Sequence, residues 1–232
     1  MNQPMRNPEG SRTLQPQCVA VKANELERHA GGGQQKATRS TEETEAAADR
    51  IAAVARKLGV RHTIATTRES RTEIWKLRRA ASPIIAAQAG GRVSMQFIED
   101  SVVPVGRLAE YVRGLRAILA RHHLSAVIFG HAGDGNLHVN PLVDVSAADW
   151  EGTLEQVLDE VAHLVARLGG TLAGEHGDGR LRAPLLETIW GAGMVRHFRT
   201  VKESFDPLGI LNPGVILPLP GQRPFDALRR YR

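Results

Sequence analysis

Apolar residues recur at two different periods along this chain, and each period predicts a type of element. Helical spacing predicts helices over residues 41–58, 69–88, 105–123 and 146–170, the last being the longest, and short helices near 181–204. Short apolar or alternating runs predict strands over residues 61–67, 93–103, 125–131, 136–144 and 171–176, with a further short strand in QCVAV. The buried strand 125–131 and its partner 136–144 form a hairpin around AGDG. This order favours an α+β fold with a mostly antiparallel sheet and helices on one face.

Individual residues mark where the predicted helices begin, bend and end. Thr41 stands at the start of the first helix, and Gly59 follows its end. Pro83 predicts a kink or a stop in the second helix. The apolar face of the third helix is formed by Leu108, Val112, Leu115 and Leu119.

The chain is organised as one domain between two less regular segments. Residues 1–41 are rich in Gly, Gln, Asn, Pro, Ser and Thr, and GGGQQKATRST has no periodicity, which predicts a poorly structured segment. The domain is predicted over residues 42–218, with a C-terminal tail over residues 219–232. No repeat with a period typical of repeat proteins is present in the sequence.

Composition narrows the class of protein. With 42% hydrophobic and 4% aromatic residues, the core must be mainly aliphatic. The net charge of +5 is modest, and no Lys/Arg run interleaves with aromatic residues, so nucleic-acid binding is not favoured. A small anionic substrate accounts for the positive charge equally well.

The single cysteine, Cys18, excludes a disulfide within the chain and a cluster held by its cysteines alone. No apolar run in the sequence is long enough to span a membrane, and the N-terminal residues lack the apolar stretch of a signal peptide. We therefore expect a cytoplasmic protein without a membrane span.

The sequence GHAGDGNLHVN carries the first candidate chemistry. His131 and His138 flank a turn in which Gly133 and Gly135 permit positive φ, so a hairpin brings both imidazoles toward one point. Glu175, in GEHGDG, offers a third ligand, and His–His–Glu with open positions is typical of a catalytic metal site. The residues alone leave open a plain glycine turn with hydrogen-bonded histidines.

Three further residues have a chemical and a structural interpretation each. In a strand the side chains of Glu175 and His176 diverge, so His176 suits a general base rather than a ligand, or else bonds a backbone carbonyl. Asn140 shares the strand face of His138 and contacts a substrate oxygen or caps the strand. Arg78 either binds a carboxylate through its guanidinium or is a solvent-exposed residue of a helix.

Three motifs together resemble a known family. GHAGDGNLHVNPL, GGTLAGEHGDGRLRAP and VKESFDPLGILNPGVIL look like the C-terminal half of FAD-linked oxidases of the vanillyl-alcohol oxidase-like superfamily. EIWKLRRAASPII and FIEDSVVPVGRLAEYVRGL are similar to its Trp-x-x-Arg helix and its Glu-Asp-x-x-x-Pro strand. The resemblance covers about residues 70–218. The superfamily includes D-lactate dehydrogenase, the glycolate oxidase flavin subunit and D-2-hydroxyglutarate dehydrogenase.

The resemblance implies a ferredoxin-like-derived cap domain beside a flavin, and it implies roles for seven residues. His131, His138 and Glu175 match divalent-metal ligands, Arg78 and Asn140 match substrate-binding residues, and His176 matches a base beside the flavin. Asn212, in LNPG, approaches the flavin side of the interface, so the residues near the cofactor are His176 and Asn212.

The implied reaction is oxidation of a D-2-hydroxy acid of the lactate, glycolate or 2-hydroxyglutarate class to its 2-oxo acid. The resemblance implies a metal that assists deprotonation of the hydroxyl, His176 as proton acceptor and FAD as hydride acceptor. Zinc is the expected metal, with manganese and iron as alternatives, since the same ligands suit all three.

The sequence departs from the family in one large respect. Residues 1–69 contain nothing like the family's Gly-rich FAD-binding motifs, and 232 residues are too few for both halves. We expect the FAD-binding domain to be a separate chain, with an iron–sulfur electron-acceptor subunit as a further partner. The alternatives are a truncated, inactive metal- or acid-binding module and, less favoured, an ether-lipid synthase-like enzyme.

Overall fold

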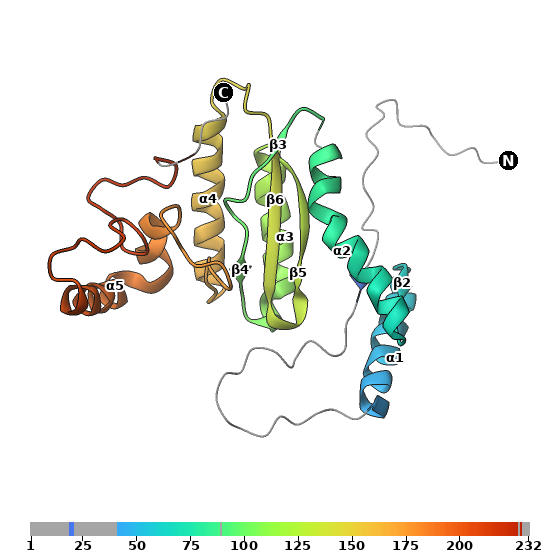
Figure 1. Ribbon diagram of the computed structural model, residues 1–232. Coiled ribbons are helices and arrows are strands. Elements are labelled where there is room, and N and C mark those ends of the chain that lie inside the picture. Colours follow the sequence, from blue (N-terminus) through green and yellow to red (C-terminus); the bar gives the residue numbers. More distant parts are fainter. Residues whose placement is uncertain (1–18, 21–40, 89, 227, 229–232) are drawn as a thin grey trace. The chain divides into compact units, whose positions relative to one another are not determined.

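The computed structural model describes residues 19–20, 41–88, 90–226 and 228 (Figure 1). The chain divides into two compact units, Met1–Ala81 and Ser82–Arg232. Most of the segment 1–41, which is predicted to be poorly structured, lies outside the described residues.

The first unit contains two short strands and two helices. Strand β1 (Val19–Ala20) lies within QCVAV and pairs in parallel with β2 (His62–Thr63), which is only part of the strand predicted over 61–67. Helix α1 (Thr41–Lys57) confirms the first predicted helix, with acidic residues in its first turn and basic residues in its last.

Helix α2 (Arg68–Gln88) crosses from the first unit into the second and contradicts one prediction. It continues through Pro83, so of the predicted kink or stop the stop is wrong. It is also longer than α4 (Trp150–Arg167), the helix predicted to be the longest. Proline removes one backbone hydrogen bond from a helix, but the neighbouring bonds can hold the helical course.

The second unit is built on an antiparallel sheet whose central strand is β6 (Asn136–Val143). On one side it pairs with β5 (Ser125–His131) along the whole hairpin. On the other side it pairs with β3 (Val93–Ser94) and β4 (Ser101–Val102). The hairpin is therefore confirmed, although β6 is the buried strand and β5, predicted to be buried, is half-exposed.

The strand predicted over residues 93–103 is interrupted in the structure. Residues 95–100 still follow β6, because the Met95 amide donates to Pro141 and the Asp100 amide donates to Leu137. Asp100 has a φ of 75°, which no regular strand permits, so the segment splits into β3 and β4. Asp100, at this break, lies where it can hold the loop of the candidate site.

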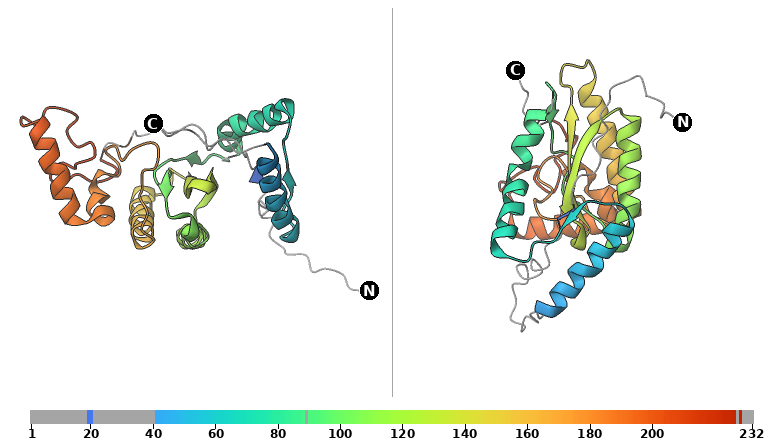
Figure 2. Two further views of the ribbon diagram at one scale, coloured as in Figure 1. Left: turned by 90° about the horizontal axis from the view of Figure 1, so that it is seen from below. Right: turned by 90° about the vertical axis from the view of Figure 1, so that its right-hand side faces the viewer.

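Helices α3 (Leu108–Arg121) and α4 (Trp150–Arg167) lie side by side on one face of the sheet (Figure 2). A short 3₁₀ helix, η2 (Val105–Arg107), precedes α3. The core between the layers is aliphatic, as the composition predicts, and each fully buried Leu or Val stabilises it by roughly 1.5–3 kcal/mol. Its fully buried residues include Leu115, Val139, Leu154, Val157, Val161 and Val165.

The chain after α4 is less regular than predicted. Only Thr171 of the predicted strand 171–176 makes a bridge, to Val102, and the residues that follow form a loop. A 3₁₀ helix, η4 (Ala183–Leu185), then leads into α5 (Leu186–Phe205), which is broken at Gly191. Phe225, within the predicted tail 219–232, packs edge-on against Phe97 in the core.

The α+β class is confirmed, with a four-stranded antiparallel sheet and α3 and α4 on the same face. Among the described residues, every helix is too short or too polar to cross a lipid bilayer.

Candidate active site

The β5–β6 hairpin brings two histidines together at one end of the sheet. His131 pairs with Asn136, and Phe129 pairs with His138, so His131 and His138 lie on the face away from α3 and α4. Their ring centroids are 5.4 Å apart. The predicted convergence of these two imidazoles is therefore present in the structure.

Only one of the two glycines in the turn uses its conformational freedom. Gly135 has a φ of 71° and follows the short 3₁₀ helix η3 (Ala132–Asp134). A Cβ atom on Gly135 would lie 1.9 Å from the Val103 carbonyl oxygen, so the turn packs directly on the chain before α3. Gly133 is not in the positive-φ region, and a Cβ atom there would meet nothing within 4 Å.

The loop that carries Glu175 and His176 is held by the carboxylate of Asp100. The backbone amides of Gly174, Glu175 and His176 donate to this carboxylate at 2.8–3.1 Å. The Asn136 side-chain amide donates to it as well, at 3.0 Å. One buried carboxylate on the β4 side thus fixes three successive residues of the loop against the start of β6.

These hydrogen bonds determine the charge of Asp100. Burial by itself would raise the pKa of this carboxyl, since Asp100 is fully buried. The amides of His176 and Glu175 and the side chain of Asn136 outweigh burial and hold the pKa of Asp100 below its ordinary value. The loop therefore favours the ionised form of Asp100.

Because the segment is a loop and not a strand, the predicted divergence of Glu175 and His176 is wrong. Glu175 Oε1 lies 3.6 Å from His131 Nε2, and Oε2 lies 3.8 Å from His138 Nε2. His176 stacks on His138 with ring centroids 5.5 Å apart and an angle of 13° between the planes. Its Nε2 lies 3.9 Å from Glu175 Oε2, so both residues face the same cluster.

A carboxylate beneath the histidines, Glu99, contacts two of them. His138 Nδ1 lies 3.3 Å from Glu99 Oε2, and His176 Nδ1 lies 2.6 Å from Glu99 Oε1. The hydrogen bond to Glu99 is the main reason why the pKa of His176 lies above its ordinary value, and it outweighs the opposing effect of partial burial. The His176 side chain remains about half exposed, whereas that of His138 is buried.

Arg182 completes the buried part of the site. Its guanidinium donates to the Glu99 backbone carbonyl at 2.7 Å and to the Gly177 carbonyl at 3.0 Å. It also lies within 4 Å of the Glu99 and Asp100 carboxylates. This buried cation balances two adjacent buried acids, which would be costly to keep charged without it.

The geometry of His131, His138 and Glu175 suits a divalent cation. One ligand atom from each lies within 4.8 Å of the others. Ligand atoms about 2.1 Å from a zinc ion lie roughly 3.4 Å apart at the corners of a tetrahedron. Each imidazole has one Glu175 oxygen near that spacing, Oε1 at 3.6 Å for His131 and Oε2 at 3.8 Å for His138, so the chemistry of the three residues fits a metal.

Two other triads lie equally close together but are less suited to hold a metal. In Glu99–His138–His176 the Nδ1 atoms already face the Glu99 carboxylate. In the Asp100 triad the carboxylate already accepts backbone amides from the loop. His131, His138 and Glu175 are the set whose ligand atoms are not taken up in this way.

The remaining predicted residues occupy different places. Asn140 lies on β6 two residues from His138, and its buried Oδ1 accepts no hydrogen bond from the described residues. Asn212 is exposed in a turn with a φ of 45°. Arg78 lies on α2 in the first unit, and its side chain is outside the described part of the structure.

Hydrogen bonds connect the turn at Asn212 to the loop of the site. The Arg180 guanidinium donates to the Pro213 carbonyl, and the Ile216 amide donates to the Gly179 carbonyl. Gln222 donates to the carbonyls of both Arg180 and Gly214. The LNPG motif is thus attached to the same loop that presents Glu175.

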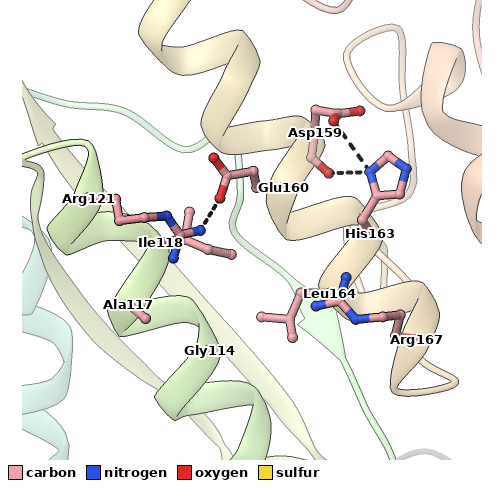
Figure 3. A pocket seen from close by; sticks show the side chains of 9 residues that line it. All are labelled: Gly114, Ala117, Ile118, Arg121, Asp159, Glu160, His163, Leu164 and Arg167. Atoms are coloured by element: carbon pink, nitrogen blue, oxygen red, sulfur yellow. Dashed lines mark hydrogen bonds and ion pairs between the residues drawn. The ribbon is translucent and has the colours of Figure 1, made fainter.

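A separate groove lies between α3 and α4 (Figure 3). It measures about 370 Å³ and contains none of the residues of the histidine cluster. Four of its titratable residues form pairs, since Arg121 contacts Glu160 and His163 bonds Asp159. The groove therefore offers no second cluster of uncommitted catalytic groups among the residues described.

Comparison with known proteins identifies the family of this chain. Residues 34–216 match the family described as FAD linked oxidases, C-terminal domain. The chain belongs to this family. The expected family is thus confirmed, and this FAD-linked oxidase C-terminal domain carries the histidine cluster on its sheet.

The relatives of this domain include enzymes with three different names. It is 38% identical over 154 residues to D-2-hydroxyglutarate dehydrogenase of Pantoea ananatis, an alignment that covers 66% of this chain and 14% of that protein. It is 35% identical over 150 residues to glycolate oxidase subunit GlcD of Bacillus subtilis, covering 65% of this chain and 31% of that protein. It is 31% identical over 171 residues to D-lactate dehydrogenase of Archaeoglobus fulgidus, covering 73% and 36%. The alignments thus span between 14% and 36% of these relatives.

Three residues of the site had no predicted role. Glu99 and Asp100 belong to the Glu-Asp-x-x-x-Pro motif, and two adjacent acids inside an apolar segment were the available signal. Arg182 had no signal, because nothing in the sequence distinguishes it from Arg180. Its burial against Glu99 exists only in the folded chain.

Proposed function

We propose that this chain is the substrate-binding half of an FAD-dependent oxidoreductase that converts a D-2-hydroxy acid to the 2-oxo acid. The observation that carries the proposal is the cluster of His131, His138 and Glu175 with the Nε2 atom of His176 beside it. The names of the relatives, which include D-2-hydroxyglutarate and D-lactate dehydrogenases, support the substrate class.

His131 Nε2, His138 Nε2 and a Glu175 oxygen would hold the divalent cation. When bound, the cation supplies a Lewis acid that lowers the pKa of the substrate hydroxyl. Zinc is the metal we propose first, and manganese and iron suit the same ligands.

His176 is the proposed general base. Its Nδ1 is bonded to Glu99, which leaves Nε2 directed toward Glu175 and the cation site. The raised pKa of His176 makes its imidazole a stronger base than an ordinary one. His176 Nε2 would accept the hydroxyl proton, and a flavin bound beside the site would supply the acceptor for the α-hydrogen and its electron pair.

Asn140 and Arg78 are the proposed substrate contacts. The Asn140 Oδ1 atom is buried beside the cluster and lacks a donor among the described residues, so a substrate hydroxyl would supply one. Arg78 would pair with the substrate carboxylate. Asn212 would face the flavin, from a turn attached to the loop of the site.

An FAD-binding domain on another chain is the proposed partner, and an iron–sulfur subunit is the proposed electron acceptor beyond it. The end of α5 and the chain after it expose large apolar side chains that suit a protein interface. These are Phe205, Leu208, Ile210, Leu211 and Ile216. We propose a cytoplasmic location for the assembly.

Metal retention and reconstituted turnover test the proposal. The purified chain is loaded with Zn²⁺, dialysed and analysed for bound metal, with Mn²⁺ and Fe²⁺ in parallel. It is then mixed with an isolated FAD-binding domain from a D-2-hydroxyglutarate dehydrogenase and assayed on D-lactate, glycolate and D-2-hydroxyglutarate with a dye acceptor. Retained metal and dye reduction that requires both chains support the proposal.

The alternative is an inactive module that binds a metal or an acid without redox chemistry. It rests on the same cluster of His131, His138 and Glu175, whose ligand atoms lie close enough together to hold a cation. Retained metal without turnover across FAD-binding domains from all three kinds of relative would favour this alternative. Absence of retained metal would contradict the proposed function and would leave the alternative only as an acid-binding module.

A further inference from the structure

Glu99 contacts two histidines that have different proposed roles. One of its carboxylate oxygens bonds Nδ1 of the proposed ligand His138, and the other bonds Nδ1 of the proposed base His176. The two rings lie nearly parallel, with an angle of 13° between their planes. Nothing else among the described residues contacts both Nδ1 atoms.

A carboxylate only accepts hydrogen bonds, so both imidazoles must donate from Nδ1. In a neutral imidazole the proton is then on Nδ1 and the lone pair is on Nε2. Both Nε2 atoms lie on the side of Glu175, at 3.8 Å for His138 and 3.9 Å for His176. One carboxylate therefore fixes which nitrogen of each ring is available at the cation site.

Glu99 is itself held in place by the buried side chain of Arg182. The Glu99 side chain is about 10% exposed, and Arg182 binds both its backbone carbonyl and, at 3.7 Å, its carboxylate. A buried carboxylate paired with a buried guanidinium has little freedom to rotate. Glu99 thus serves as a rigid acceptor for two donors.

We infer that Glu99 is a positioning residue that sets the Nδ1–H tautomer of both His138 and His176. The inference deepens the proposed function and rests on it for the roles of the two histidines. Through His138 the residue presents a ligand nitrogen to the metal, and through His176 it presents a basic nitrogen to the substrate. A single substitution at this position therefore changes metal binding and proton transfer together.

The test begins with the tautomers of the wild-type chain. Long-range ¹H–¹⁵N NMR correlations distinguish Nδ1–H from Nε2–H imidazoles, and the spectra are recorded at a pH at which both rings are neutral. Single His→Gln substitutions assign the signals of His138 and His176. The Nδ1–H form is expected for both residues, and an Nε2–H form for either one overturns the inference.

Glu99→Gln is the second part of the test. The two Nδ1 atoms bond different oxygens of Glu99, and the amide replaces one of these oxygens by a donating nitrogen, so only one ring keeps an acceptor at its present place. At least one histidine is expected to change tautomer, and the affinity for Zn²⁺, measured by competition with a chelator, is expected to fall by about 10- to 100-fold. Two unchanged tautomers in a folded variant would overturn the inference.

A matched control separates position from charge. Glu110→Gln removes an exposed carboxylate on α3 that forms an ion pair with Arg107, and it should leave both tautomers and zinc affinity unchanged. If Glu99→Gln fails to fold, the wild-type tautomers decide the inference alone. Wild-type tautomers as expected but without zinc retention would instead contradict the proposed metal site, so the two failures are distinguishable.

Discussion

The Asp100 carboxylate accepts a hydrogen bond from the His176 backbone amide at 2.8 Å, across 76 residues of sequence. The same carboxylate holds Glu175, so one buried residue beside β4 places both the proposed ligand and the proposed base. The cluster on the hairpin is complete only because this contact forms.

Asp100→Asn should destabilise the protein by about 3 kcal/mol. The variant replaces an acceptor of several hydrogen bonds by an amide whose nitrogen faces backbone donors, and it leaves Arg182 with less compensating charge. Urea unfolding followed by circular dichroism measures the loss. Asp144→Asn, at an exposed carboxylate that accepts hydrogen bonds from Ser146, is the control and should cost far less. Equal losses in the two variants would mean that Asp100 does not organise the loop.

His131→Ala should abolish metal retention with little effect on folding. The His131 side chain is 39% exposed, and its Nε2 lies 3.6 Å from Glu175, so its removal takes a ligand away without opening the core. Metal analysis after dialysis and thermal unfolding are the two readouts. His163→Ala, at an exposed histidine on α4 that bonds Asp159, should change neither. Full metal retention by His131→Ala would remove this residue from the site.

Gly135→Ala should destabilise the protein by about 3 kcal/mol or more, because the backbone is in the positive-φ region and the added Cβ would meet the Val103 carbonyl oxygen at 1.9 Å. Gly133→Ala, two residues earlier in the same turn, meets no atom within 4 Å and should be neutral. Chemical denaturation of the pair measures the difference. A neutral Gly135→Ala would show that the turn does not pack on Val103 in this way.

In the Asp206→Asn variant the free energy of unfolding should change less with pH in the acid range than in wild type. The pKa of Asp206 lies below its ordinary value, first because Lys202 donates to its carboxylate and also because the amides of Leu211 and Ile210 do. A carboxyl whose pKa is lowered in the folded state contributes to the free energy of unfolding. This contribution is complete above the ordinary pKa of about 4 and is lost as the pH falls through the folded-state pKa.

Unfolding midpoints between about pH 6 and about pH 2.5 measure this effect. Wild type should exceed Asp206→Asn at the upper end of the range, and the two should converge at the lower end. Glu187→Gln, at an exposed residue of α5, should follow the wild-type profile. Parallel curves for wild type and Asp206→Asn would contradict the assigned role of the Asp206 carboxylate.

The sequence by itself determined the elements whose signals are local. The hairpin of β5 and β6 follows from two apolar runs around AGDG, and it carries His131 and His138 to one end of the sheet. Helix α1 follows from its spacing and end residues. Such features depend on neighbours a few residues apart, which a sequence pattern records directly.

Only the tertiary structure decided the partners of that hairpin. Residues 172–176 have the composition of a strand, yet they form a loop because the Asp100 carboxylate takes up the amides of three successive residues. For the same reason Glu175 and His176 face one cluster, where strand alternation would have separated them. The roles of Glu99 and Arg182 depend on burial and on contacts across about 40 to 80 residues of chain, which no local pattern encodes.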